Sequence, residues 1–381
     1  MTRSAEVVIV GGGVNGLACA YNLAKRGMKD IVVLEKGYLG TGATGRCGAG
    51  IRQLWGMEEN IILAREAVKI FENLDAELGF NTFFRQGGYL MLIFDEHEYE
   101  TVTKTIPLQN RLGVPTVLMS PEEIRDFIPG LSTDGVLAGA FCQTDGTAYP
   151  YAVLWGYGEA ARRLGVDIRV MTTVTSVASR VGGGFEIVTT DGTYHAPRLI
   201  NVAGARTRDI GAMLGIDIPT EPYCHEIAVT ESLKAFLKPM IISPKKGFYF
   251  SQSLRGEIIG GVGDENKESS YATASSPDFL FRFAKVLRDT FPKLGKARII
   301  RQWAGLYDMS PDSRPILGTV DGLDGYYHAC GFSGHGFMLS PIVARLLTEL
   351  ITSGTTSIPI DNLSLARFKS KTLTRDPYVV G

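Results

Sequence analysis

The sequence predicts an α/β fold, in which a domain built on a parallel sheet is interrupted by a second domain with a mixed or antiparallel sheet. Three observations predict it. A strand, a glycine-rich turn, a helix and a second strand follow one another within the first 35 residues. Two later stretches, near 145–220 and 320–370, repeat this alternation of buried strands and helices. The stretches between them carry the signals of antiparallel strands.

The first unit begins with the apolar run 7–10, which predicts a short buried strand. The turn 11–16 follows, and apolar spacing from Leu17 to Arg26 predicts a helix that Gly27 ends. The run 31–34 is the second strand. Strands that are apolar without interruption are typical of a parallel sheet covered on both faces.

Periodicity predicts the remaining elements in chain order. Further helices are expected at 57–79, at 121–128 after Ser120 as N-cap, at 151–164, at 277–291, and after Gly336 through Leu350. Further strands are expected at 83–94, 168–177, 185–190, 199–202, 226–230, 248–251, 257–261 and 326–329. We therefore expect a discontinuous dinucleotide-binding domain of residues 1–82, 145–220 and 319–381, with a substrate domain of residues 83–144 and 221–318 inserted into it.

Composition excludes several classes of protein. With 39 basic and 40 acidic residues the net charge is −1, which argues against a nucleic-acid binder. The five cysteines are scattered without a C-x-x-C pair, so we expect neither a disulfide framework nor a metal site, and a reducing compartment is favoured. The apolar stretch 7–24 is broken by glycines, and no signal peptide is visible. We expect a cytoplasmic protein without a transmembrane segment.

The turn 11–16 has the pattern and the context of a Rossmann-type dinucleotide site. Gly11 allows the tight turn, Gly13 lets the backbone approach a pyrophosphate, and Gly16 lets the helix pack close to the strand. The pyrophosphate would lie at the helix N-terminus. Glu35 follows Gly16 by 19 residues, where its carboxylate can accept hydrogen bonds from a ribose diol. The same carboxylate would repel a 2′-phosphate.

Three more glycine-rich segments indicate which dinucleotide is bound. They are 40–50, 201–205 and 331–337, and each follows a predicted strand. Each alone is most simply an ordinary turn. Four such segments in this order favour a flavin dinucleotide, because a flavin has a ring system that the backbone must approach as well as a pyrophosphate.

The order of these motifs resembles the D-amino-acid-oxidase-like family of FAD enzymes over essentially the whole chain. Within it, the chain resembles the β-subunits of sarcosine oxidase and of dye-linked L-proline dehydrogenase. The stretches that carry the resemblance are 46–53, 144–148, 221–223, 303–307, 311–313 and 331–337. The glycine turn and the resemblance together imply FAD contacts from Gly11, Gly13, Val14, Asn15, Gly16, Glu35, Lys36, Thr44, Arg46, Cys47, Gly50, Ile51, Val174, Ala203, Gly204, Gly305, Gly331, Gly334, His335, Gly336 and Phe337.

Departures from the family pattern refine these expectations. Gly305 and Pro150 stand at the two positions where relatives attach a flavin covalently, so the resemblance implies non-covalent FAD and, at most, a non-covalent FMN at a subunit interface. Met338 stands where monomeric sarcosine oxidases grip the substrate carboxylate with a lysine. By the same resemblance, the lysine that helps oxygen react with reduced flavin in relatives is replaced near Tyr249. Electrons would then pass to an α-type partner subunit carrying further redox groups, with peripheral membrane association through such partners.

The resemblance implies oxidation of the C–N bond of a secondary or primary amino acid such as proline or sarcosine, by hydride transfer to flavin N5. Arg52 is the main candidate for the substrate carboxylate, because a guanidinium suits bidentate recognition. Tyr249, Tyr307 and His225 are further pocket candidates, and no general base is needed. Two alternatives stay open: a stand-alone oxidase that reduces oxygen to peroxide, and a non-catalytic FAD-binding assembly subunit.

Overall fold

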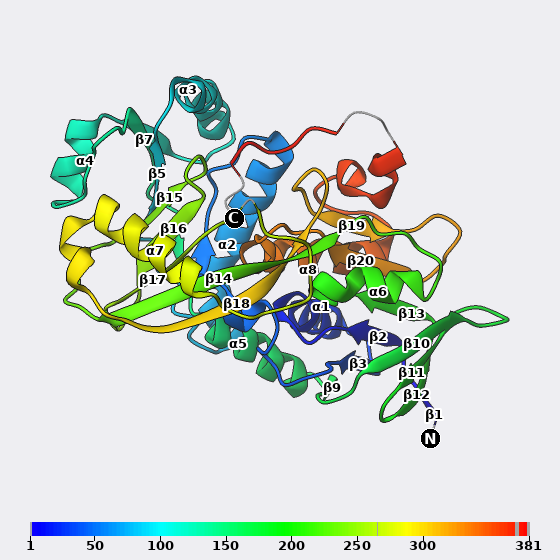
Figure 1. Ribbon diagram of the computed structural model, residues 1–381. Helices are drawn as coiled ribbons and strands as arrows, with labels where there is room; N and C mark the ends of the chain where they lie inside the picture. Colours follow the sequence, from blue (N-terminus) through cyan, green and yellow to red (C-terminus); the bar gives the residue numbers. More distant parts are fainter. Residues whose placement is uncertain (1, 265, 370–372, 379–381) are drawn as a thin grey trace.

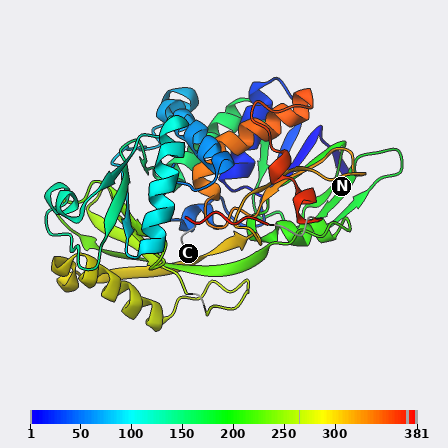
Figure 2. The ribbon, with the colours of Figure 1, turned by 90° about the horizontal axis from the view of Figure 1, so that it is seen from above.

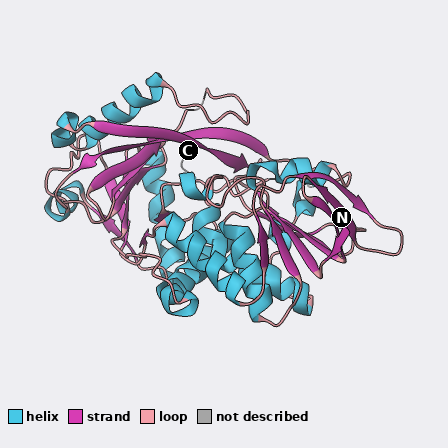
Figure 3. Cartoon of the chain, turned by 90° about the horizontal axis from the view of Figure 1, so that it is seen from below, coloured by secondary structure: helices cyan, strands magenta, loops and turns pink. Residues whose placement is uncertain are grey.

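A computed structural model describes residues 2–264, 266–369 and 373–378 (Figure 1). The strands fall into two main groups at opposite ends of the molecule, and most of the helices gather between and beneath them (Figure 3). One group is a six-stranded sheet and the other an eight-stranded sheet.

The six-stranded sheet has the order β19-β20-β13-β2-β3-β9 and is parallel except for β19. Its strands are β2 (Val7–Val10), β3 (Ile31–Leu34), β9 (Asp167–Arg169), β13 (Arg198–Asn201), β19 (Ile316–Thr319) and β20 (Tyr326–Cys330). The nearby helices are α1 (Val14–Lys25), α2 (Glu58–Leu78), α5 (Pro150–Arg163), α6 (Thr207–Ala212) and α8 (Gly336–Ser353). A four-stranded sheet of β1 (Thr2–Ser4), β10 (Val174–Ser179), β11 (Phe185–Thr189) and β12 (Gly192–Ala196) lies alongside.

Burial on both faces explains why β2 is apolar throughout. Val7 and Ile9 belong to the core formed with the helices, whereas Val8 and Val10 belong to a core shared with Phe185 of the four-stranded sheet. Alternate side chains of a strand point to opposite faces, so both sets must be apolar.

The eight-stranded sheet has the order β18-β14-β17-β16-β15-β5-β7-β6 and is antiparallel except where β15 meets β5. Its strands are β5 (Tyr89–Ile93), β6 (Thr116–Met119), β7 (Ala138–Cys142), β14 (Glu221–Ser232), β15 (Met240–Ser243), β16 (Phe248–Gln252), β17 (Glu257–Val262) and β18 (Ile299–Met309). The helices of this part are α3 (Glu96–Arg111), α4 (Pro121–Phe127) and α7 (Pro277–Thr290). The long pair β14 and β18 extends from this sheet toward the six-stranded one (Figure 2).

Most predicted elements are confirmed, with four differences. The strand expected at 226–230 is longer, because β14 covers Glu221–Ser232. α1 begins at Val14, so Gly16 lies inside the helix rather than before it. The strand expected at 83–94 covers only 89–93, because Phe83 and Gly88 take positive φ angles of 56° and 86°. The single strand expected at 168–177 is wrong: a positive φ of 54° at Met171 separates β9 from β10, which lie in different sheets.

Several elements were not predicted. α3 escaped because it is largely polar: only Val102 and Gln109 of its residues are buried, and Pro107 lies inside it. The sequence also failed to predict several strands: β6, β7, β12, β15, β18, β19 and the two-residue pair β4 (Gly50–Ile51) and β8 (Gly146–Thr147). Among the described residues, α8 is long and apolar enough to cross a membrane, with a mean hydropathy of 1.2, and 67% of it is buried inside the protein.

Candidate cofactor and substrate site

A cavity of about 440 Å³ lies between the two main sheets. Its walls come from the carboxyl ends of the parallel strands, the usual ligand site of such sheets, and from the inner face of the eight-stranded sheet. All but four of the predicted site residues line it. The sequence therefore brings together groups that lie more than 300 residues apart.

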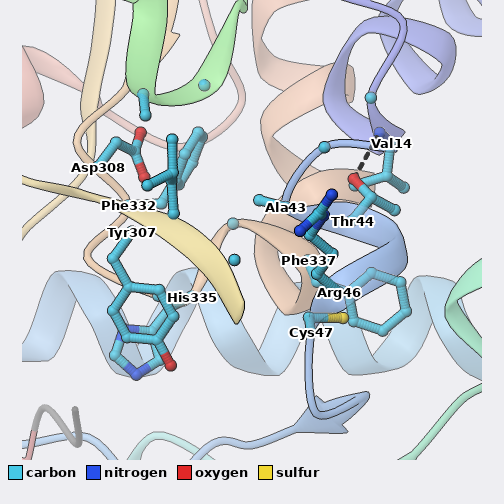
Figure 4. A pocket seen from close by; sticks show the side chains of 18 of the residues that line it. Val14, Ala43, Thr44, Arg46, Cys47, Tyr307, Asp308, Phe332, His335 and Phe337 are labelled. Atoms are coloured by element: carbon cyan, nitrogen blue, oxygen red, sulfur yellow. Dashed lines mark hydrogen bonds between the residues drawn. The ribbon is translucent and has the colours of Figure 1, made fainter. Parts of the chain in front are cut away.

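The first end of the cavity is the N-terminus of α1. A Cβ added to Gly11 would collide with the Val202 carbonyl oxygen, and one added to Gly16 would collide with the carbonyl oxygen of Gly11. Gly11 also has a φ of 116°. Both positions therefore require glycine. The Val14 N–H donates to Thr44 Oγ1 at 3.1 Å (Figure 4), which ties the second glycine-rich loop to the helix N-terminus.

Glu35 ends β3 beside this turn. One carboxylate oxygen accepts a hydrogen bond from the Gly12 N–H at 2.9 Å, and the other accepts from the Gly37 N–H at 2.8 Å. These bonds fix the carboxylate and still leave acceptor capacity on each oxygen. Burial and the nearby Arg206 guanidinium lower the pKa of the adjacent Lys36.

The N-terminus of α8 meets that of α1 at the cavity. Asn15 Nδ2 donates to the Gly336 carbonyl oxygen at 3.2 Å, which joins the two helices. Gly336, Phe337 and Met338 line the cavity, and the first turn of α8 contains no acidic residue. Two helix N-termini thus face one cavity, an arrangement that favours negative charge.

Arg52 is a buried cation at the other end. Its guanidinium lies 4.3 Å from the Trp55 ring centre, and Nη2 is 3.2 Å from His335 Nε2. Nη1 is buried and has no hydrogen-bond partner among the described residues. Burial lowers the pKa of Arg52, and the same cause together with Arg52 holds the pKa of His335 well below its usual range. His335 is therefore neutral, and its Nε2 can accept a hydrogen bond from Arg52 Nη2.

A wall of stacked aromatic rings belongs to the eight-stranded sheet. The His225 ring lies 4.5 Å from Tyr307 at 14° and 5.6 Å from Tyr249 at 17°. Burial lowers the pKa of His225 to about 4, and its Nε2 has no partner among the described residues. Burial also raises the pKa values of both tyrosines. Figure 4 shows Tyr307 well apart from the Val14–Thr44 bond.

Four predicted cofactor residues do not line the cavity. Gly16 lies in α1, where it allows close packing, and Gly331 packs against Ile316 with a φ of 64°. Ile51 is buried in β4. Val174 lies in β10 of the four-stranded sheet, and two residues before it the Thr172 N–H donates to the Glu35 carbonyl oxygen.

Sequence reasoning missed several lining residues. Tyr89 lies against Gly50, where an added Cβ would collide with its hydroxyl. Asp308 is buried beside the loop 331–337, and burial raises its pKa to about 6. Tyr271 donates to Asp209 Oδ1 at 2.7 Å and lies beneath the Arg206 guanidinium. Asp308 directly follows the predicted residue Tyr307, so its place in the sequence could have indicated that it lies near the site. Tyr89 and Tyr271 have no such signal, because only the fold brings them to the cavity.

Unpaired buried atoms around the cavity indicate a ligand with many polar groups. Asn15 Oδ1, Arg52 Nη1, His225 Nε2 and Asp308 Oδ2 all lack partners among the described residues. Buried polar atoms are normally paired, so four in one cavity need a ligand to complete them. FAD fits this set, because its pyrophosphate suits the helix N-termini and its ribityl and ring groups offer donors and acceptors.

Comparison with known proteins agrees with this fit. The chain is 31% identical over 369 residues to sarcosine oxidase subunit beta of Rhodobacter capsulatus, covering 96% of this chain and 88% of that one. The structure of L-proline dehydrogenase from P. horikoshii matches with a TM-score of 0.93 and 36% identity, over 98% of this chain and 100% of that one. Glycine oxidase from Geobacillus kaustophilus shares the fold, with a TM-score of 0.89, 22% identity and coverage of 96% and 99%.

The model of the DAO family, described as FAD dependent oxidoreductase, matches residues 6–350. That range includes every predicted site residue, and it confirms the resemblance drawn from the glycine-rich segments and the FAD cofactor that it implied. The chain belongs to the DAO family of FAD dependent oxidoreductases.

Proposed function

We propose that the chain is an amino-acid dehydrogenase that oxidises the C–N bond of a secondary or primary amino acid such as proline or sarcosine. The observation that carries this proposal is Arg52, a buried guanidinium with an unpaired Nη1 in the FAD cavity. A buried unpaired cation is costly, and a carboxylate that bonds both guanidinium nitrogens would complete it. The named activities of the sarcosine oxidase and L-proline dehydrogenase relatives support an amino-acid substrate.

The six-stranded part would hold FAD and the eight-stranded part the substrate, with the division at the boundaries expected from the sequence. The N-terminus of α1 would bind the pyrophosphate, Glu35 the adenosine ribose, and the first turn of α8 the flavin ring. When bound, FAD supplies the acceptor for the two electrons of the substrate C–H bond. The chain itself binds the carboxylate, orients the α-carbon and excludes water.

The aromatic wall suits a neutral amine. His225, Tyr249 and Tyr307 are uncharged at neutral pH, because burial lowers the pKa of His225 to about 4 and raises those of the tyrosines. These three rings therefore offer no counter-ion to a protonated amine. His225 Nε2 has a free position for a hydrogen bond to the substrate nitrogen.

Electrons leave through a partner subunit or carrier rather than through oxygen. The relatives from Rhodobacter capsulatus and Rhizobium meliloti are each named subunit beta of sarcosine oxidase, which supports an α-type companion chain. The departure near Tyr249 from the oxygen-activating lysine points the same way. A non-covalent FMN at the interface with that companion, and a cytoplasmic location, complete the proposal.

An anaerobic stopped-flow experiment tests the reaction. The holoenzyme is mixed with L-proline, sarcosine and other amino acids, and the reduced form is then mixed with air or with a dye. We expect bleaching with at least one amino acid, fast recovery with the dye and slow recovery in air. Equal recovery in both would establish an oxidase, and absence of bleaching with every amino acid would favour an assembly subunit.

Substitution of Arg52 tests the carboxylate site. Arg52→Ala should keep its FAD and lose at least about tenfold in kcat/KM, roughly 1.4 kcal/mol of transition-state stabilisation. Arg301→Ala is the matched control, because Arg301 also lies over a tryptophan ring, at 5.8 Å from Trp303, but does not line the cavity. Equal kinetics in the two variants would remove Arg52 from the substrate site.

Attachment of the cofactor has its own test. Gly305 has no side chain to form a bond, and Pro150 is the first residue of α5 and has no nucleophile. Acid precipitation should leave the yellow colour in the supernatant. Flavin retained on the denatured chain would contradict non-covalent binding.

A further inference from the structure

Two buried carboxylates hold the segment that carries Arg52, one at each end. Asp145 Oδ1 accepts hydrogen bonds from the backbone N–H and from Nε2 of Gln53, both at 2.9 Å. Asp376 Oδ2 accepts from the Met57 N–H at 3.1 Å. Both acids are nearly inaccessible to solvent, at 0% and 1% exposure. The segment 52–57 is therefore fixed by side chains that come from distant parts of the sequence.

Neither acid pairs with Arg52, although both interact with it electrostatically. Their hydrogen bonds go to amide groups instead. Among the described residues, the Arg52 guanidinium contacts Trp55 and His335, and Nη1 stays free. The acids thus stabilise the cation from a distance without forming hydrogen bonds to its guanidinium nitrogens. Nη1 therefore remains available to an external carboxylate.

Asp145 and the two residues after it contact the chain on both sides of Arg52. The two residues after Asp145 belong to β8, which pairs with β4 just before Arg52: Ile51 lies opposite Gly146, and Gly50 opposite Thr147. The Asp145 side chain holds the residue just after Arg52. A shift of Asp145 must therefore move the Arg52 backbone.

We infer that Asp145 is a positioning residue for substrate binding, which sets the direction of the Arg52 guanidinium through Gln53. The inference rests on the proposed function, in which Arg52 binds the substrate carboxylate. Oδ2 of Asp145 has no hydrogen-bond partner among the described residues. The bonds to Gln53 need one acceptor oxygen, so an asparagine can replace the aspartate.

Binding of pyrrole-2-carboxylate to the holoenzyme tests the inference, with pyrrole as the probe that lacks the carboxylate. Flavin absorbance reports the Kd without turnover. Asp145→Ala should raise the Kd of pyrrole-2-carboxylate at least about tenfold and leave weak pyrrole binding unchanged. Asp145→Asn should stay within about twofold of the parent, because it keeps the acceptor.

Asp75→Ala is the matched control. Asp75 Oδ1 likewise accepts from both the backbone N–H and the side chain of one residue, but that residue is Thr82, which is not next to Arg52 and does not line the cavity. This variant should bind the probe normally. An unchanged Kd in Asp145→Ala, or equal losses in Asp145→Ala and Asp75→Ala, would overturn the inference.

A double variant separates this inference from the proposed function. If Asp145 acts through Arg52, Asp145→Ala should add less than about twofold to the loss caused by Arg52→Ala. Full additivity overturns the inference and leaves the proposed function intact, whereas an unchanged Kd in Arg52→Ala alone overturns the carboxylate site itself. If Asp145→Ala does not fold, Gln53→Met, which removes one of the two bonds, should raise the Kd about threefold or more; an unchanged Kd there overturns the inference.

Discussion

The two walls of the cavity are built in different ways. The wall from the six-stranded sheet is mostly backbone: glycine turns, strand ends and the N-termini of α1 and α8. The wall from the eight-stranded sheet is mostly side chains, with stacked rings of His225, Tyr249 and Tyr307. A wall of backbone can bind one cofactor tightly and tolerates few substitutions. In a wall of side chains, by contrast, single substitutions can change which substrate is bound.

The backbone wall should lose its ability to bind FAD when its packing is disrupted. Gly16→Ala places a methyl group against the Gly11 carbonyl oxygen, where backbone on both sides cannot move aside. Overpacking of this kind costs about 1–3 kcal/mol or more, and we expect a protein without FAD. Gly158→Ala in α5 is the control, because its methyl group would meet Leu17 at an ordinary 3.4 Å. The measurement is the ratio of flavin to protein absorbance after purification, and normal flavin content in Gly16→Ala would contradict the comparison.

A side chain that serves the backbone wall should have a smaller effect. Glu35→Ala removes the proposed acceptor for the ribose and the observed acceptor for the N–H groups of Gly12 and Gly37. Unpaired buried donors cost about 1–3 kcal/mol, so the Kd for FAD should rise by roughly one to two orders of magnitude. Glu35→Gln keeps one acceptor oxygen, so its Kd for FAD should lie between those of the parent and of Glu35→Ala. Titration of the apoprotein with FAD gives both values; an unchanged Kd would reduce Glu35 to a strand-end charge.

The segment that carries Arg52 is held by a buried acid, Asp145, that should make stability depend on pH. Burial raises the pKa of Asp145 to about 7 in the folded protein. In the unfolded chain the carboxyl ionises near 4, so from pH 5 to pH 6 only the folded state holds the proton, and stability falls as the pH rises. Asp145→Asn lacks this proton, and its stability relative to the parent should increase by about 1 kcal/mol over that pH unit. Denaturant unfolding at pH 5 and pH 6, with FAD in excess, measures the free energy of unfolding of both proteins. If that free energy depends on pH equally in the two, Asp145 is already ionised in the folded parent.

The smallest effect is expected from a single hydroxyl in the aromatic wall. Tyr249→Phe keeps the ring that stacks 5.6 Å from His225. Loss of the hydroxyl should lower kcat/KM by about two- to fivefold, within the net value of one hydrogen bond. Steady-state kinetics with a dye acceptor measure it. A loss above a hundredfold would make the hydroxyl a catalytic group and break the comparison.

The same contrast explains how much could be predicted. Glycines at 11, 13 and 16 encode a local backbone turn and the start of the helix that follows it, so this part of the first wall is visible in sequence. Arg52 was predicted from its neighbouring loop, but its contact with His335 joins residues 283 positions apart and depends on the finished fold.

The second wall depends on strand pairing that no local pattern specifies. β14 places His225 opposite Gly305, a register set between segments about 80 residues apart. Tyr89 was missed for the same reason: its strand was expected, but the parallel pairing of β5 with β15 decides that it faces the cavity.

The order of strands in the six-stranded sheet has a consequence for biosynthesis. β2 is made from residue 7 onward, yet its neighbour β13 ends at Asn201 and the sheet is complete only after Cys330. At about 5–20 residues per second, the ribosome needs roughly 15–60 s to make the chain between the first glycine turn and α8. During that time the α1 N-terminus lacks its partner helix. Cofactor loading is therefore a late event, and a ribosome that stalls before α8 leaves a chain that cannot retain the flavin.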